Sequence, residues 1–69
     1  MQISDFSELT SVLIDEHVEL CLSKHNKTGE YIVYFDSGDV VIEESEIMLQ
    51  TKNYEEAKNI FNKTKNHMQ

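Results

Sequence analysis

The side chains best suited to chemistry in this 69-residue chain are His17, Cys21 and His25, which follow one another at intervals of four residues. On a helix this spacing would gather two imidazoles and a thiol on one face, and such sets bind zinc. The segment "HVELCLSK" instead alternates apolar and polar residues, as a half-buried strand does. Residues four apart on a strand lie roughly 13 Å apart, whereas zinc ligand atoms lie about 2.0–2.3 Å from the ion. The pattern therefore predicts no metal site, and we expect the polar face of this strand to be exposed.

The same spacing argues against a catalytic Cys–His pair. Along a strand, His17 and His25 would lie too far from Cys21 to remove its proton. The many acidic residues of the chain would raise the pKa of the thiol rather than lower it. We expect no enzyme activity and no cofactor.

A second polar group consists of carboxylates around the dipeptide Ser37-Gly38. The segment "FDSGDVVIEESE" holds five acids in twelve residues. The candidate partner-binding residues are Asp36, Asp39, Glu43, Glu44, Glu46 and Glu30. They allow two interpretations. One is a solvated rim whose charges keep strand edges from aggregating. The other is a rigid acidic surface that competes with nucleic acid for a binding site on a protein.

The net charge of −7 is unevenly distributed along the chain. Through Glu46 there are eleven acids and two lysines, which gives −9, whereas the remainder has two acids and four lysines, which gives +2. Affinity for nucleic acids and anionic membranes comes mostly from cations that meet phosphates. The charge therefore disfavours direct binding to nucleic acid or membrane and favours a basic surface on a protein partner.

Length and composition indicate a single small domain over residues 1–69. Hydrophobic residues make up 39% and charged residues 28%, which is typical of a globular chain. One cysteine cannot form an internal disulfide, and the N-terminal residues "MQISDFSELT" lack the pattern of a signal peptide. No apolar stretch approaches the roughly 20 residues that span a bilayer. We expect a cytoplasmic protein.

The spacing of apolar residues predicts an α+β fold. Asp5 and Glu8 form a capping pattern, and the apolar residues that follow recur at helical intervals, so we expect a short helix over residues 5–15. Three strands follow, "HVELCLSK", "YIVYF" and "VVIEE", with a turn at Asp36–Asp39 between the second and the third. The sequence of segment 47–52 allows a continued strand, a bulged edge strand or an approach to the next helix.

A C-terminal helix completes this prediction. Asn53 and Glu56 form a second capping pattern. An apolar stripe follows at Tyr54, Ala57, Ile60 and Phe61. The expected architecture is a short N-terminal helix, a three-stranded antiparallel β-meander and a C-terminal helix.

The segments "MQISDF", "VELCLSK", "YIVYFDSGDVVIEESE" and "YEEAKNIFNK" resemble, over about residues 1–62, a small phage-encoded anti-CRISPR family. That family inhibits type II CRISPR nucleases by occupying the site that reads the PAM on target DNA. The resemblance implies a host bacterial cytoplasm, PAM-mimicking roles for Asp36 and Asp39, and an extended contact through Glu43 and Glu44. The family also has an acidic C-terminal segment, whereas this chain ends in the basic "NKTKNHMQ".

These observations predict a non-enzymatic inhibitor whose acidic hairpin blocks a basic nucleic-acid-binding site on a partner, such as a CRISPR-associated nuclease. An alternative is an antitoxin, immunity protein or regulatory adaptor that binds through an apolar surface or a strand edge, with Met48 in the contact. A homodimer is a third interpretation.

Overall fold

The computed structural model describes residues 1–68 and folds them into one antiparallel four-stranded sheet with a single α-helix. The strands are β1 (Phe6–Asp15), β2 (Val18–His25), β3 (Tyr31–Asp36) and β4 (Ile47–Thr51), in the order β1-β2-β3-β4. The helices are the short 3₁₀ helices η1 (Ile3–Asp5) and η2 (Glu44–Glu46) and the α-helix α1 (Tyr54–Met68). The predicted α+β class is confirmed.

The helix expected over residues 5–15 is wrong, because this segment is the strand β1. Leu9 and Leu13, which suggested a helical stripe, are 48% and 60% exposed. Val12 and Ile14, which follow the strand period of two, pack against the core instead. Two register shifts in the pairing with β2 interrupt the alternation, and this hides the strand pattern in the sequence.

The third strand expected at "VVIEE" is also wrong, and the turn expected at Asp36–Asp39 does not close a hairpin. Residues 37–46 form a loop between β3 and β4, in which Val41 makes only an isolated bridge with Gln2. The backbone of this loop bonds to the N-terminal segment, since Ile3 N donates to Val40 O at 2.9 Å and Ile42 N donates to Met1 O at 2.7 Å. The segment left open, Ile47–Thr51, is the strand that pairs with β3. The sheet therefore has four strands rather than three.

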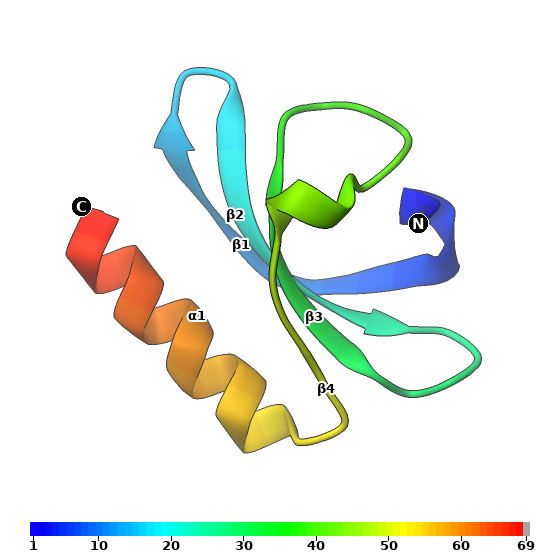
Figure 1. The fold of residues 1–69 in the computed structure, drawn as a ribbon. Helices are drawn as coiled ribbons and strands as arrows, with labels where there is room; N and C mark the ends of the chain where they lie inside the picture. Colours follow the sequence, from blue (N-terminus) through cyan, green and yellow to red (C-terminus); the bar gives the residue numbers. More distant parts are fainter. Residues whose placement is uncertain (69) are drawn as a thin grey trace.

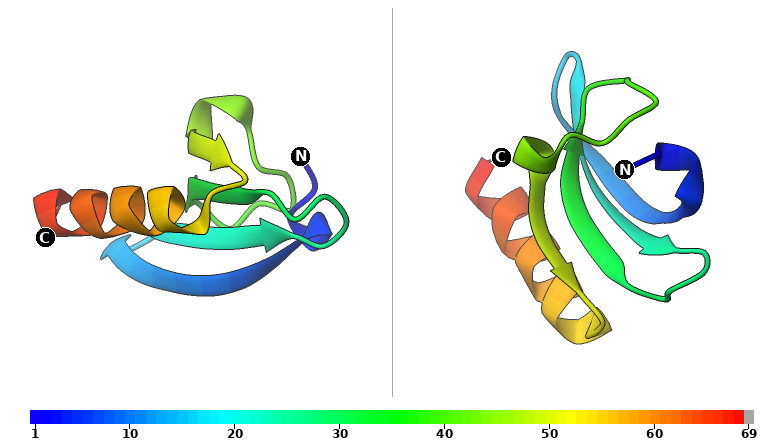
Figure 2. Two further views of the ribbon diagram at one scale, coloured as in Figure 1. Left: turned by 90° about the horizontal axis from the view of Figure 1, so that it is seen from below. Right: turned by 45° about the vertical axis from the view of Figure 1, so that its right-hand side comes forward.

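The two central strands are covered on both faces. On one face Leu20, Leu22 and Val33 pack against the α1 residues Ala57 and Phe61. Figure 1 shows α1 on this side of the sheet, while the N-terminal segment and the loop between β3 and β4 lie on the other side. Figure 2 shows this loop beside the N-terminal segment.

The second face has its own small core, made of Cys21, Ile32, Tyr34 and Ile42. The polar face of β2, expected to be exposed, is therefore buried. Cys21 is 0% exposed, and the hydroxyls of Ser23 and Tyr34 lie 3.3 Å apart within hydrogen-bond distance. This hydrogen bond lets two polar side chains be buried without loss of a partner.

The predicted C-terminal helix is confirmed as α1. Its N-cap is Asn53, whose Oδ1 accepts a hydrogen bond from Glu56 N at 3.1 Å. The helix runs back along the sheet in the direction opposite to β4 (Figure 1). Within residues 1–68, no helix is both long enough and apolar enough to cross a membrane.

Candidate functional site: an acidic loop

The acidic candidates lie mainly in the loop of residues 36–46, which we call the acidic loop. Its apolar residue Ile42 is 3% exposed and packs into the second core. The ammonium group of Met1 donates to Ile42 O at 3.1 Å, and Ile42 N donates back to Met1 O. The loop is therefore held to the sheet at its middle by burial and by backbone hydrogen bonds.

The start of the acidic loop is fixed by Asp36 and Gly38. Asp36 Oδ1 accepts a hydrogen bond from Gly38 N at 2.8 Å, which closes an Asx turn. Gly38 has φ = 98°, a conformation that side-chain-bearing residues rarely adopt. The "DSG" sequence therefore marks a turn, as expected, but this turn opens a long loop instead of a two-residue hairpin.

The end of the acidic loop is fixed by the carboxylate of Glu46. Its Oε1 accepts a hydrogen bond from Glu43 N at 2.8 Å, and its Oε2 accepts one from the Ser37 hydroxyl at 3.3 Å. Glu46 N donates to Glu43 O at 2.9 Å, which closes η2. Two of the candidate carboxylates, Asp36 and Glu46, thus shape the loop and are less available to a partner.

The other carboxylates of the loop point to solvent. Asp39, Glu43 and Glu44 are exposed, and within residues 1–68 the carboxylates of Asp39 and Glu44 accept no hydrogen bond from another side chain. No lysine forms an ion pair with a carboxylate in this part of the chain, and the one carboxylate–imidazole contact joins Glu16 to His17 at 3.9 Å. The negative charge of the loop is therefore not neutralised within the described residues.

Glu30 does not belong to this group. It lies just before β3, whereas Asp36 ends β3, so the two residues are separated by roughly 20 Å of extended strand. Glu30 Oε2 accepts a hydrogen bond from Gln50 Nε2 at 3.4 Å. The other five candidates are brought together on one loop, and Glu30 lies at the opposite end of the strand.

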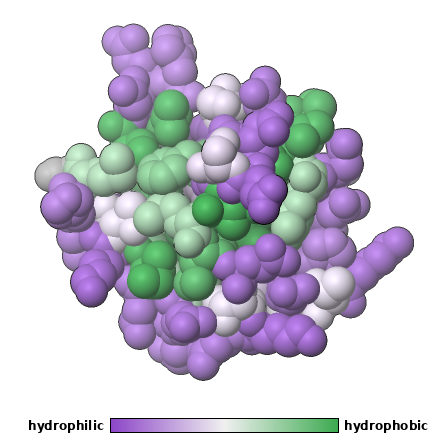
Figure 3. All heavy atoms as spheres, in the orientation of Figure 1, coloured by the Kyte–Doolittle hydropathy of each residue, from purple (hydrophilic) through white to green (hydrophobic). Residues whose placement is uncertain are grey.

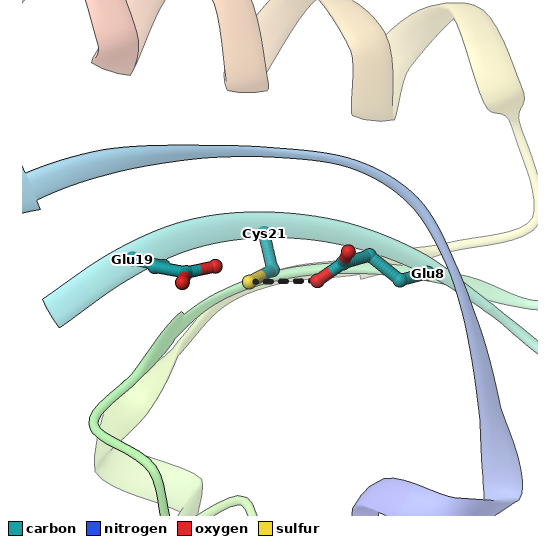
Figure 4. Close-up of side chains that lie close together, drawn as sticks. All are labelled: Glu8, Glu19 and Cys21. Carbon is teal, nitrogen blue, oxygen red and sulfur yellow. Dashed lines mark hydrogen bonds between the residues drawn. The ribbon is translucent and has the colours of Figure 1, made fainter.

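The structure adds two carboxylates that the sequence did not indicate. Glu19 pairs with Asp36 across β2 and β3, and Glu8 comes from β1. Figure 4 shows Cys21 between Glu8 and Glu19, with its thiol donating to Glu8 Oε1 at 3.6 Å. These residues approach only because β1 pairs with β2, and the prediction of a helix over residues 5–15 concealed that. The alternation of Thr10, Val12 and Ile14 was the available signal.

The thiol of Cys21 is unsuited to nucleophilic chemistry. Burial, and after it the negative charges of Glu8, Asp36 and Glu19, together raise its pKa from 9.0 to about 12. A thiol that keeps its proton at neutral pH is a poor nucleophile.

The same environment bears on metal binding. Glu8, Glu19 and Cys21 each offer a ligand atom, and these atoms lie within 4.8 Å of one another. The cysteine would bind a cation only as a thiolate, which its pKa of about 12 opposes. Its proton is also already donated to Glu8. We therefore assign no metal to this group.

The two histidines of the repeating set do not approach Cys21 as ligands or bases. His17 lies in the turn between β1 and β2, and its side chain is 87% exposed. His25 ends β2, and its Nδ1 accepts hydrogen bonds from Lys27 N and Thr28 N, both at 3.1 Å. This confirms the strand geometry on which the interpretation of the spacing depended, and it gives His25 a role in the turn.

No protein-family model matches the chain, and no curated protein or solved structure matches it either.

Proposed function

We propose that this protein is a non-enzymatic inhibitor that binds a basic nucleic-acid-binding surface of a partner protein through its acidic loop. The observation that carries this proposal is the set of exposed carboxylates at Asp39, Glu43 and Glu44, which have no lysine partner among residues 1–68. They stand on a loop that is anchored at its start, middle and end by hydrogen bonds.

Anchoring matters because a fixed array of charges binds at a lower entropic cost than a flexible acidic tail. A partner surface lined with lysine and arginine would meet these carboxylates in place of phosphates. Glu8, Glu19 and Asp36 add to the negative potential on the same side of the sheet, since their charges raise the pKa of the Cys21 thiol between them. The loop therefore offers long-range attraction together with a defined shape.

The family resemblance supplies the first partner to test, the PAM-reading site of a type II CRISPR nuclease in a bacterial cytoplasm. In that case Asp39 would meet the PAM-reading arginines, and Glu43 and Glu44 would extend the contact. The Asp36 carboxylate has the Asx turn as its first role, so we assign it to positioning. The resemblance depends on a layout of one helix, three strands and a second helix. The structure differs from it, because strand β1 replaces the first helix and the acidic loop replaces the third expected strand. The proposal of a basic partner surface does not require that family.

The test compares wild-type protein with the variant Asp39→Lys/Glu43→Lys. A type II CRISPR nuclease loaded with guide RNA is assayed for target-DNA binding in the presence of each protein, at low and at moderate salt. A tagged form of each protein is also used to capture partners from bacterial lysate. The charge-reversed variant should bind its partner at least about tenfold more weakly, because like charges then face each other. Binding of the wild type should weaken as salt rises.

The matched control is Asp5→Lys/Glu16→Lys, which changes the net charge equally at two exposed positions outside the loop. Circular dichroism confirms that both variants are folded. A nucleic-acid-binding protein that is retained by wild type and control, released by salt or DNA, and lost by the loop variant would support the proposal. Equal retention by all three proteins, or no such partner, would reduce the acidic loop to a solvated rim.

A further inference from the structure

We infer that the free edge of β4 pairs with β4 of a second copy of this chain, in antiparallel orientation and centred on Leu49. β4 is the last strand in the sheet order, so its outer edge has no neighbouring strand among residues 1–68. Its five residues, "IMLQT", contain no charge and no proline. Natural edge strands usually carry such features to prevent pairing, and β4 lacks both.

The other edge of the sheet is protected. β1 has two register shifts along its pairing with β2, and it carries the acids Glu8 and Asp15. Shifts of this kind twist an edge strand away from a flat partner. β4 has one shift, at Met48, in its pairing with β3. The two edges therefore differ in charge, and β4 is the edge suited to pairing.

A groove flanks β4 on each face of the sheet. The first, of about 540 Å³, is lined by Met1, Ile42, Glu44 and the strand residues Ile47–Gln50. The second, of about 420 Å³, lies between β4 and the end of α1 and is lined by Phe35, Met48, Lys63, Thr64, His67 and Met68. Figure 3, in the orientation of Figure 1, shows apolar side chains gathered on the face of the molecule where β4 and α1 are seen, between hydrophilic margins.

The two grooves match what an added strand would bring. Successive side chains of a strand point to opposite faces of a sheet. A strand placed beside β4 would therefore direct its side chains into both grooves in turn. All three methionines of the chain line these grooves, and flexible methionine side chains adapt well to a contact surface.

The charges around β4 favour a second copy over an unrelated strand. Glu46 precedes the uncharged strand and Lys52 follows it, each three residues from Leu49. Antiparallel pairing centred on Leu49 places Lys52 of the second copy opposite Glu46 and two positions from the exposed Glu44. The two-fold symmetry repeats this contact at the other end. In each copy, the acidic end of β4 thus meets a lysine of the other copy.

The direction of α1 gives the same complementarity on the helical face. The end of α1 lies beside Met48, near the start of β4. Its beginning lies where Tyr54 packs against Tyr31, the residue paired with Thr51 at the end of β4. Antiparallel pairing therefore puts the acidic first turn of one helix at the same end of the contact as Lys63 and Lys65 of the other.

The experiment measures the mass of the full chain by sedimentation over a range of concentrations. Wild type should show a concentration-dependent dimer. Met48→Lys, which places a charge next to the centre of the edge, should be monomeric, whereas the control Leu13→Lys, at a more exposed residue on β1, should dimerise as wild type does. A wild type that stays monomeric would overturn the proposal. So would a dimer that survives Met48→Lys.

A charge swap tests the antiparallel arrangement itself. Lys52→Glu should weaken self-association by about tenfold or more, because like charges then meet at both ends. Glu44→Lys should weaken it less, because Lys52 keeps Glu46 opposite it while the substituted side chain lies two positions away. An equimolar mixture of the two variants should form a mixed dimer, since their charges are complementary. Failure of the mixture to associate, with both variants folded by circular dichroism, would overturn this register. Glu44 also belongs to the acidic loop, but Met48 and Lys52 lie outside that loop and self-association is measured with this protein alone, so this result is independent of the proposed function.

Discussion

The free energy of unfolding should fall at alkaline pH, and ionisation of Cys21 should account for part of that fall. Replacing Cys21 by alanine should therefore make the fall smaller. In the folded chain the pKa of Cys21 is raised from 9.0 to about 12, first by burial and then by nearby carboxylates. A raised pKa means that the folded state holds the proton more tightly than the unfolded state does. The resulting contribution to stability is complete below pH 9 and is lost as the pH rises through 9 toward 12.

The size of this loss follows from the shift. One pKa unit corresponds to about 1.4 kcal/mol, and between about pH 8 and 10 the unfolded thiol loses nearly all of its proton while the folded thiol keeps it. The wild type should therefore lose about 1.4 kcal/mol over this interval from Cys21 alone. For a small domain this lowers the midpoint of thermal unfolding by about 6–11 °C.

The assay is urea unfolding of wild type and Cys21→Ala at about pH 8, 9 and 10. The alanine variant loses buried contacts and should be less stable at the lowest pH by about 1 kcal/mol. The informative quantity is the slope of the unfolding free energy against pH, which should be shallower in the variant. Tyr34, whose pKa is raised from 10.0 to about 12 mainly by burial and in smaller part by Cys21, is present in both proteins, and most of its own contribution is lost above pH 10, beyond the interval compared. Parallel curves for the two proteins would refute the reasoning.

Two local features of the fold give further predictions. Asn53→Ala removes the side chain that accepts Glu56 N and should lower the unfolding free energy by about 1 kcal/mol, whereas Asn53→Asp, which keeps a capping oxygen, should retain most of it; urea titration measures both. Gly38→Ala should lower the unfolding free energy by about 1 kcal/mol, because φ is 98° at this position. The added methyl group would meet open space, so the cost comes from the backbone conformation and not from a clash. Thermal unfolding checks this change, and an unaltered midpoint would contradict the role given to the Asx turn.

Much of the fold could be predicted from local sequence signals. In β2, the alternation of Leu20 and Leu22 with polar residues corresponds to a strand with its apolar face toward α1. In α1, the cap at Asn53 and the stripe through Ala57 and Phe61 correspond to the start of the helix and its buried face. These signals arise from contacts between residues close in sequence, or from one face of one element, so a short window contains them.

The errors lie where a distant partner decides the structure. Val41 could have extended a hairpin, but its bridge is to Gln2, and nothing near Val41 in the sequence indicates this. In β1, Leu9 and Leu13 have the spacing of a helical stripe, although the segment is a strand. Two register shifts interrupt its alternation, and they arise only from the pairing with β2. Both segments have apolar residues that either structure could bury, so tertiary contacts decided between them.

The candidate site was predictable to the extent that it is continuous in sequence. Asp39, Glu43 and Glu44 belong to one loop, so their proximity required no knowledge of the sheet. Glu8 and Glu19 meet only through the pairing of β1 with β2, and a scan for clustered acids could not find them. The structural use of Glu46 depends on hydrogen bonds from Glu43 N and the Ser37 hydroxyl that no composition reveals.

The division of the interior into two cores implies that the molecule does not open all at once. The face under α1 is sealed by a 15-residue helix, whereas the second face is closed mainly by Ile42, Ile3 and a few backbone bonds to the N-terminal segment. Partial unfolding begins where the fewest buried contacts must break. The acidic loop and the N-terminal segment can therefore detach from the second face while the sheet and α1 remain in place. Such an excursion would expose Cys21 to solvent without global denaturation. The amides of Val40 to Ile42 would then exchange their hydrogens faster than those of β2 and β3, and the acidic loop would belong to the least protected unit of the domain.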